Sequence, residues 1–407
     1  EWRSAIIFIL VAIMMVSLSL SRALLSMSMM AFVLFSFFHK DIKNHFRNFF
    51  SSPLLWSMSL LFFLPLFSGL WSDDKERWLD IVRIKLPLLF LPLAFAGPIR
   101  LSKKQWEALA FIFIALITAG TIWSMFHYVT NIAAVHEGYL HSKTIITPLD
   151  NDHVRFSWLI SVASLLTGWL FITKRKQDNP IAWIMCILTI WLVFFLHILA
   201  ARTGLFSFYL IIVLFIARLI YKKTNLVYTL PLFAIIILLP VVSYFMLPTF
   251  QNRVRYFIHD QTYFKDAHYL QGSNDAVRVI SLKAGWNILN EWPVNGVGFG
   301  DLFIETNKWY GINYPQMIET DKIYPSSEIL IYGAACGWVG LIAFIFILSV
   351  PFFIPVKKKF LWILLNATAA FSFLFDIGLE VQFGVFIYSF IILWWWKWLN
   401  AEAVEKL

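Results

Sequence analysis

The sequence predicts an all-α polytopic membrane protein with about 12 transmembrane helices in one membrane domain, residues 1–407. Three observations predict it: 60% of the 407 residues are hydrophobic, only 14% are charged, and the apolar residues fall into long runs. A soluble domain carries roughly 45–50% apolar and about 25% charged residues. The composition therefore excludes a soluble enzyme and a disordered protein. It also excludes a nucleic-acid binder, despite the net charge of +9.

A membrane span needs about 20 mostly apolar residues. The fourth predicted span carries Arg83 and Lys85 near its start and two prolines inside. The first run is interpreted as a retained span rather than a signal peptide. The predicted spans are residues 4–20, 23–38, 53–71, 81–98, 107–129, 153–173, 181–200, 204–220, 226–247, 329–354, 359–376 and 379–397.

The basic residues support this count and predict an orientation. With the N-terminus inside, every inside loop holds three basic residues, as the positive-inside rule requires. Both termini are then cytoplasmic, and the tryptophan-rich residues 394–398 are interpreted as an interfacial anchor. The triplets are Lys40, Lys43 and Arg47; Arg100, Lys103 and Lys104; Lys174, Arg175 and Lys176; Arg218, Lys222 and Lys223; and Lys357, Lys358 and Lys359.

Most of the polar chain faces outward. Residues 248–328 form a predicted periplasmic loop, with an amphipathic helix near 275–290 whose apolar residues recur at helical spacing. Span centres are almost free of charge, which argues against an ion-coupled transporter. The polar chemistry gathers at the outer membrane boundary, which suits a protein that handles lipid-linked head groups.

Two arginines stand out at that boundary. Arg202 follows the short connection after span seven, and its planar guanidinium suits bidentate phosphate binding. An arginine that reaches lipid phosphate explains it equally well. Arg278 lies near the start of the amphipathic helix, where a plain surface arginine is the alternative.

Three further segments carry weaker signals. Gly296 and Gly298 could bring backbone amides close to an anion, although a glycine-rich turn explains them too. Asp150, Asp152 and His153 could hold a metal, but a helix cap is favoured. Residues 325–330 enter span ten as a capped helix start and are followed by small residues at packing spacing.

Together these features resemble the O-antigen ligase and O-antigen polymerase superfamily, GT-C-like glycosyltransferases of the bacterial inner membrane. The resemblance rests on the topology, the pair Arg202-Thr203, the stretch from Arg278 to Gly298, and the segment from Pro325 to Leu330. It implies a glycan donor on undecaprenyl diphosphate and a sugar-hydroxyl acceptor, the lipid A–core in ligases. It also implies that Arg202 and Arg278 hold the diphosphate, with no metal or other cofactor. Arg155, Gly296, Gly298 and Glu328 are the candidate supporting residues.

One departure from the family concerns the general base. The family has a histidine just after the proline at the entrance to this span, and this chain has Ser326. A serine hydroxyl cannot replace imidazole, whose pKa near 6.5 suits a base. Three explanations remain. The one that we favour is that the chain is an inactivated form. Alternatively, its base is His268, His259 or Glu328, or the match between this segment and the family motif is displaced by one residue or more.

The expected function is O-antigen ligation at the periplasmic face of the inner membrane, with membrane lipids but no nucleic acid as further partners. An O-antigen polymerase and a protein O-oligosaccharyltransferase are alternatives within the same superfamily. A flippase or exporter for lipid-linked glycan is the non-enzymatic alternative.

Overall fold

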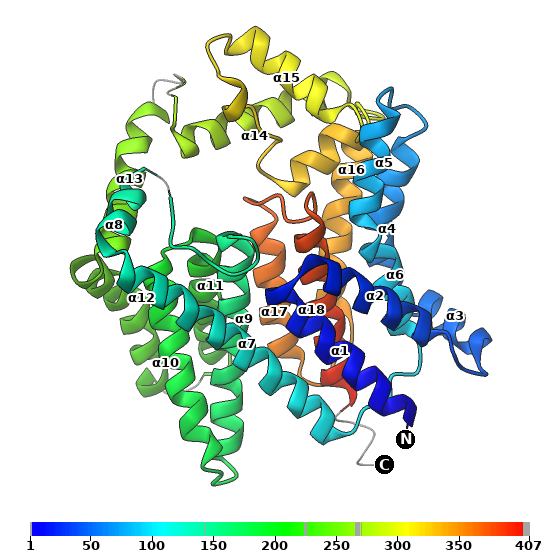
Figure 1. Ribbon diagram of the computed structural model, residues 1–407, viewed down its shortest axis with the longest axis vertical. Helices are drawn as coiled ribbons and strands as arrows, with labels where there is room; N and C mark the ends of the chain where they lie inside the picture. The colour runs from blue at the N-terminus through cyan, green and yellow to red at the C-terminus, as the bar shows by residue number, and fades with distance from the viewer. Residues whose placement is uncertain (1, 142, 224–225, 265–268, 270, 402–407) are drawn as a thin grey trace. The chain divides into compact units, whose positions relative to one another are not determined.

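The computed structural model describes residues 2–141, 143–223, 226–264, 269 and 271–401 (Figure 1). Within these ranges the regular structure is entirely helical, which confirms the predicted fold class. The helices are α1 (Trp2–Leu20), α2 (Arg22–Ser36), α3 (Ile42–Ser51), α4 (Pro53–Ser68), α5 (Lys75–Lys85), α6 (Pro87–Ala96), α7 (Lys103–Thr130), α8 (Ile132–Leu140), α9 (His153–Arg175), α10 (Ile181–Leu199), α11 (Arg202–Tyr221), α12 (Leu226–Met246), α13 (Pro248–Phe264), α14 (Asn274–Glu291), α15 (Leu302–Asn313), the 3₁₀ turn η1 (Glu319–Asp321), α16 (Glu328–Phe353), α17 (Lys359–Ser372) and α18 (Gln382–Ala401).

Seven helices of the described chain are long and apolar enough to cross a membrane, so the protein is multi-pass. They are α1, α7, α9, α10, α11, α12 and α16. The helix pair α3 and α4, bent by 82°, makes an eighth if it counts as one span. α2 and α17 are apolar but shorter, at 15 and 14 residues. The total of 12 spans stays a prediction.

The chain folds into two compact units, each assembled from separate stretches of sequence. Unit 1 comprises Glu1–Val11, Ser26–Lys103 and Asp260–Leu407, and unit 2 comprises Ala12–Leu25 and Lys104–His259. The single membrane domain and the periplasmic loop 248–328 stay predictions.

Unit 2 is built around α9. This helix packs against α10 and α11, and α11 also packs against α12. Its side chains are buried along most of its length, whereas α12 leaves most of its apolar side chains exposed. Such exposed apolar surface is typical of helices that face lipid, since lipid rather than water is then the solvent.

Unit 1 is built around α16, α4, α6 and α18. α16 packs against α4, and α6 packs against both α4 and α18, so α16 and α4 run side by side in Figure 1. α14 lies across α16 and also contacts α15. The apolar residues at helical spacing on α14 are buried, as is typical of an amphipathic helix on a protein surface; they are Val277, Ile280, Ala284 and Ile288.

The helical structure at the predicted fourth span, 81–98, is divided and begins before residue 81. Helix begins at Lys75, so much of the stretch between the third and fourth predicted spans belongs to α5. A turn at Leu86 separates α5 from α6, and Pro87 starts the second helix, where its missing amide costs nothing. Asp74 caps α5 by accepting a hydrogen bond from the Arg77 amide at 2.9 Å. Hydropathy did not predict this helix, because its residues are largely polar. Hydropathy identifies segments that can lie in lipid and does not report where a helix begins or ends.

The interpretation of residues 394–398 as an interfacial anchor is corrected for three of its tryptophans. Trp394, Trp395 and Trp398 are buried within unit 1. The rings of Trp394 and Trp398 stack with centroids 6.0 Å apart. Aromatic rings buried against one another contribute to packing rather than to contact with lipid head groups.

α16 is interrupted in its third turn. Cys336 (φ −127°, ψ 15°) and Gly337 (φ 68°, ψ −166°) leave the helical conformation. The carbonyls of Ala334 and Ala335 accept hydrogen bonds from Val297 and Gly298, at 3.0 and 2.9 Å. Residues 293–298 therefore satisfy backbone groups that the interruption frees, as an apolar environment requires.

Gly296 fits this junction because it lacks a side chain. Its φ is +65°, and a Cβ there would lie 2.3 Å from the carbonyl carbon of Ala335. We expect Gly296→Ala to lower the free energy of unfolding by more than the roughly 1–2 kcal/mol that the left-handed conformation costs alone. Gly272→Ala is the control, since Gly272 has φ +82° and a Cβ added to it would meet no atom within 4 Å. Equal losses in thermal unfolding in detergent would contradict the steric explanation.

Candidate functional site

Arg202 is the first residue of α11 in unit 2. The preceding residue pair makes a sharp turn, in which Ala200 adopts a left-handed conformation with φ 48°. The guanidinium of Arg202 lies 5.1 Å from the centre of the Phe257 ring. The side chain is half-buried, so it keeps access to a ligand while the ring restricts its motion.

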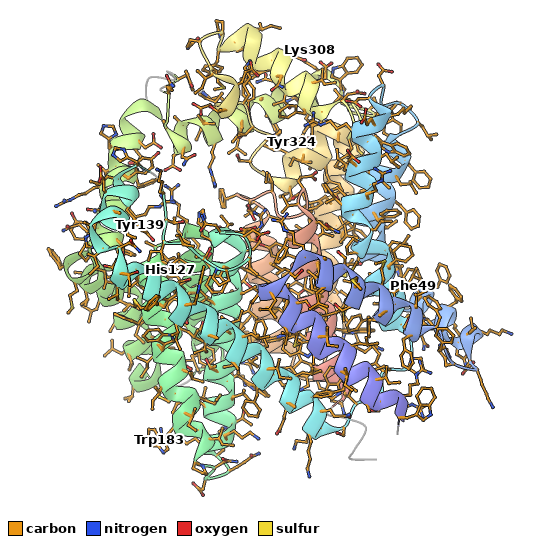
Figure 2. All side chains as sticks on the ribbon, viewed as in Figure 1. Phe49, His127, Tyr139, Trp183, Lys308 and Tyr324 are labelled. Atoms are coloured by element: carbon orange, nitrogen blue, oxygen red, sulfur yellow. The ribbon has the colours of Figure 1, made fainter. Side chains whose placement is uncertain are left out.

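The turn that carries Arg202 is held in place from two sides. The end of α10 leaves carbonyls without helical partners. Thr249 donates to the carbonyl of Ile198 at 2.6 Å, and the buried Tyr139, labelled in Figure 2, donates to the carbonyl of Leu199 at 2.8 Å. The α10–α11 turn is therefore a rigid support for the arginine.

Arg155, a candidate supporting residue, is paired within unit 2. Its Nη1 lies 3.1 Å from a carboxylate oxygen of Asp152, and both side chains are largely buried. Asp152 also accepts a hydrogen bond from the Arg155 amide at 3.1 Å, so it caps α9 as the favoured interpretation expects. Asp150 lies near Arg22 instead, with 2.5 Å between charged atoms.

Arg278 lies on α14 in unit 1 and is exposed. The helix is capped by Ser273, whose hydroxyl accepts a hydrogen bond from the Ala276 amide, and not by Asn274 or Asp275 as expected. Asp260 accepts hydrogen bonds from the Ser273 hydroxyl and from the Asp275 amide. This buried carboxylate fixes the beginning of the helix that carries Arg278.

Ser326 is connected to the same helix. Its hydroxyl lies 2.9 Å from the hydroxyl of Ser281, and its amide donates to that Ser281 oxygen at 3.1 Å. Ser281 in turn lies 2.7 Å from the carbonyl oxygen of Arg278. One side chain thus bridges the backbone of Arg278 and position 326, so α14 and the entrance to α16 hold these two positions together. The meeting of Arg202 with them stays a prediction.

The glycines take part in the junction with α16. The Gly298 amide donates to Ala335, and a Cβ on Gly298 would lie 2.2 Å from the Ser72 hydroxyl. The Gly296 amide donates to the Trp292 carbonyl at 3.1 Å. Both amides donate hydrogen bonds within the protein. The alternative interpretation, a close-packed glycine turn, therefore accounts for the two glycines.

Glu328 is fully buried at the start of α16. Its Oε1 accepts a hydrogen bond from the Leu379 amide, and its own amide donates to the Phe373 carbonyl at 3.1 Å. Its Oε2 has no hydrogen-bond partner among the described residues. Glu328 therefore joins α16 to the segment between α17 and α18.

An ion pair close to Glu328 was not predicted from the sequence. Lys85 is fully buried, and its Nζ lies 2.6 Å from Glu380 Oε1 and 2.9 Å from the Leu379 carbonyl oxygen. The ammonium also lies 5.0 Å from the centre of the Tyr332 ring. The sequence signal for this ion pair was the position of Lys85 at the edge of an apolar run, because an ionisable residue in such a place usually has a partner. The partner is 295 residues away in sequence.

A cavity of about 460 Å³ lies beside this ion pair in unit 1. Arg77 and Tyr324 meet at it: Arg77 Nε donates to the Tyr324 hydroxyl at 3.0 Å. Burial raises the pKa of Tyr324, against the opposing effect of Arg77, so the phenol stays protonated. Figure 2 labels Tyr324. The lining residues are Asp74, Glu76, Arg77, Asp80, Ile81, Ile84, Tyr324 and Glu380.

Two histidines are further candidates for the base. His259 belongs to unit 2, whereas Ser326 belongs to unit 1. His268 lies outside the described residues. Within the described part of unit 1, Ser327 and Glu328 hydrogen-bond to Phe373 and Leu379, so the segment 373–380 contacts the residues that follow position 326.

These features define a multi-pass α-helical membrane protein that presents arginines at helix starts and a polar cavity next to a buried ion pair. Residues 187–345 match the family model described as O-Antigen ligase. This match supports the predicted O-antigen ligase and polymerase superfamily. Arg202, Arg278 and Ser326 all lie within the matched range. No curated protein matches the chain.

Proposed function

We propose that this protein transfers a glycan from undecaprenyl diphosphate to the lipid A–core oligosaccharide. The observation that carries the proposal is the O-antigen ligase match, whose range contains both Arg202 and Arg278. The family supports a transferase of the ligase or polymerase type that acts on lipid-linked glycan in a membrane. The ligase reaction, the undecaprenyl carrier and the lipid A–core acceptor are the finer parts of the proposal.

The two arginines supply the charge that the reaction needs. As the bond between the sugar and the diphosphate breaks, negative charge grows on the leaving group. Guanidinium groups that face this charge stabilise the transition state more than the ground state, which accelerates transfer. Arg202 is suited to this because its turn is anchored by Thr249 and Tyr139. Arg278 is suited because Ser281 ties its backbone to position 326.

The proposed location follows from the positive-inside pattern. We place the chain in the bacterial inner membrane with both termini in the cytoplasm and the site facing the periplasm. Labelling of single cysteines in intact cells tests this. A cysteine at exposed position 283 on α14 should react with a membrane-impermeant maleimide, and one at position 176 should react only after lysis. The reverse result would overturn the orientation.

A reconstituted assay distinguishes the reactions. The purified chain in lipid nanodiscs receives undecaprenyl-diphosphate-linked glycan and lipid A–core from the bacterium that carries the gene. Glycan on lipid A supports the ligase proposal. Longer chains on undecaprenyl diphosphate, formed without lipid A, would identify a polymerase instead. Movement of donor across a vesicle membrane without any transfer would identify a flippase.

A further inference from the structure

The cavity beside the Lys85–Glu380 ion pair is not explained by the two arginines that are proposed to bind the donor. It has room for a sugar ring, and its lining combines carboxylates, a guanidinium and an aromatic ring. Carboxylates accept hydrogen bonds from sugar hydroxyls, and aromatic rings pack against the apolar faces of sugars. These are the groups that a carbohydrate site needs.

Glu380 contributes to this cavity a carboxylate of which one oxygen is paired with a lysine. Its Oε1 binds the buried Lys85 ammonium, and only 6% of its side chain is exposed. Its Oε2 makes no hydrogen bond to any residue that the structure describes. This oxygen is not one of the fully buried acceptors without a partner, so it reaches the open space of the cavity. An accessible acceptor at the cavity wall can take a hydrogen bond from a ligand hydroxyl.

Glu380 also lies next to the segment in which the family carries its base. Ser327 and Glu328 both hydrogen-bond to the Phe373 carbonyl, and Glu328 accepts a hydrogen bond from Leu379, the residue before Glu380. Tyr324, two residues before Ser326, lines the same cavity as Glu380. The fold thus brings the Glu380 carboxylate to a cavity that borders the segment in which this chain lacks imidazole.

The charge of the cavity favours the acceptor over the donor diphosphate. Four carboxylates and one guanidinium line it. Asp80 is offset by Arg83 at 2.8 Å, and Glu380 is offset by Lys85. Of the remaining charges, Asp74 and Glu76 outnumber Arg77, so the lining keeps a net negative charge that disfavours a diphosphate. A neutral or amino sugar does not meet this repulsion.

We propose that this cavity receives the acceptor sugar and that Glu380 is the general base of the reaction, an inference that rests on the proposed function. The acceptor hydroxyl donates to Glu380 Oε2. Its oxygen forms the new bond to C1 of the donor sugar while its proton passes to Glu380. The bond from C1 to the diphosphate oxygen breaks, and that electron pair stays on the diphosphate. Glu380 then releases the proton to water in the open cavity.

Substitution of Glu380 tests the assignment in the nanodisc assay. Removal of a general base lowers the rate of transfer by about 10²–10⁴-fold, so Glu380→Gln should lower kcat by this amount per folded molecule. The variant should also lose stability, because Lys85 is left buried without its counter-ion. Glu380→Asp keeps a base and should retain more activity. Glu305→Gln is the matched control, because Glu305 also pairs with a lysine, Lys308, at 2.6 Å but lies outside the cavity. It should transfer at the rate of the unmodified protein.

A double variant separates catalysis from structure. If Glu380 serves only as the partner of Lys85, then Lys85→Gln combined with Glu380→Gln, which removes both charges, should restore transfer. If Glu380 is the base, the double variant regains stability but stays about 10²–10⁴-fold slower. Restored transfer would overturn the assignment.

Ser326→His provides the opposing test. If the unmodified chain already has its base in Glu380, this variant should change transfer by less than about tenfold, since imidazole there duplicates an existing function. A gain of several orders of magnitude would show that the chain lacks a working base, and Glu380 would be ruled out. If the unmodified chain transfers glycan to no acceptor, the proposed function fails and the inference fails with it. An active chain that tolerates Glu380→Gln would overturn the inference alone.

Binding of the acceptor can be measured without transfer. In a Cys186→Ser background, Glu76→Cys places an exposed thiol at the cavity, while Cys336 is buried. Lipid A–core at ten times its Kd should slow maleimide labelling by about tenfold, since about one site in eleven is then empty. Donor alone should leave the labelling rate unchanged. Protection by donor and not by acceptor would overturn the assignment of the cavity.

Discussion

Arg278→Ala should lower glycan transfer by about two to three orders of magnitude, since one preorganised group that stabilises developing negative charge accounts for that factor. Its stability should stay close to that of the unmodified protein. Arg278 is exposed on α14, and alanine favours helix. The measurement is the initial rate in the nanodisc assay together with the midpoint of thermal unfolding.

Two variants on the same helix make this result specific. Lys283→Ala removes another exposed cation from α14 and should transfer at the normal rate. Arg278→Lys keeps the charge but loses the planar pair of donors, so its rate should fall between those of the other two. A normal rate for Arg278→Ala would remove Arg278 from the donor site.

Arg202→Ala should reduce transfer to a similar extent. Its contact with Phe257 is worth about 0.5–1 kcal/mol at an exposed site, so the stability loss should be small. The expected signature is a large loss of kcat with a minor change in unfolding. A loss of stability that accounts for the lost activity would instead give Arg202 a structural role.

Lys85→Gln should lower the free energy of unfolding by about 3–5 kcal/mol, because it leaves the Glu380 carboxylate buried without its counter-ion. Lys85 is fully buried, and its ammonium contacts both Glu380 and the Leu379 carbonyl. Unfolding in detergent by heat or denaturant measures the change. Replacement of Glu380 by Gln in the same chain should recover much of it, because no unpaired charge then remains.

Arg83→Gln is the matched control on the same helix. Arg83 and Asp80 also form an ion pair, but both side chains are more than half exposed. Exposed pairs contribute about 0–1 kcal/mol, because water screens them and two long side chains lose freedom. Equal losses for Arg83→Gln and Lys85→Gln would show that burial of the Lys85–Glu380 pair has no special effect.

The elements that local pattern specifies were predictable. Runs of apolar residues set the positions of α9, α10, α11 and α16 within a few residues. The recurrence of apolar residues also placed the helix that became α14, and its buried face is the one that the spacing indicates. These features depend on neighbours along the chain, which a sequence displays directly. The motif residues Arg202 and Arg278 were found because each lies next to such an element.

Other features were out of reach because they join distant stretches. The interruption of α16 at Gly337 makes sense only with residues 293–298 beside it. The cap of α14 moved to Ser273 because Asp260 lies close enough to bind it. Hydropathy did not reveal that residues 81–85 belong to α5 and are separated by a turn from the apolar helix α6.

The sequence by itself determined that this chain is a helical membrane protein with an O-antigen ligase pattern, because apolar run length and short motifs are written in neighbouring residues. Only the tertiary structure brought Lys85 to Glu380 across 295 positions and formed the cavity that both Tyr324 and Glu380 line. The physical reason is that a buried charge needs a partner of opposite charge, but the sequence around that charge does not identify which residue the partner is. The packing of α5 against α18 makes that choice.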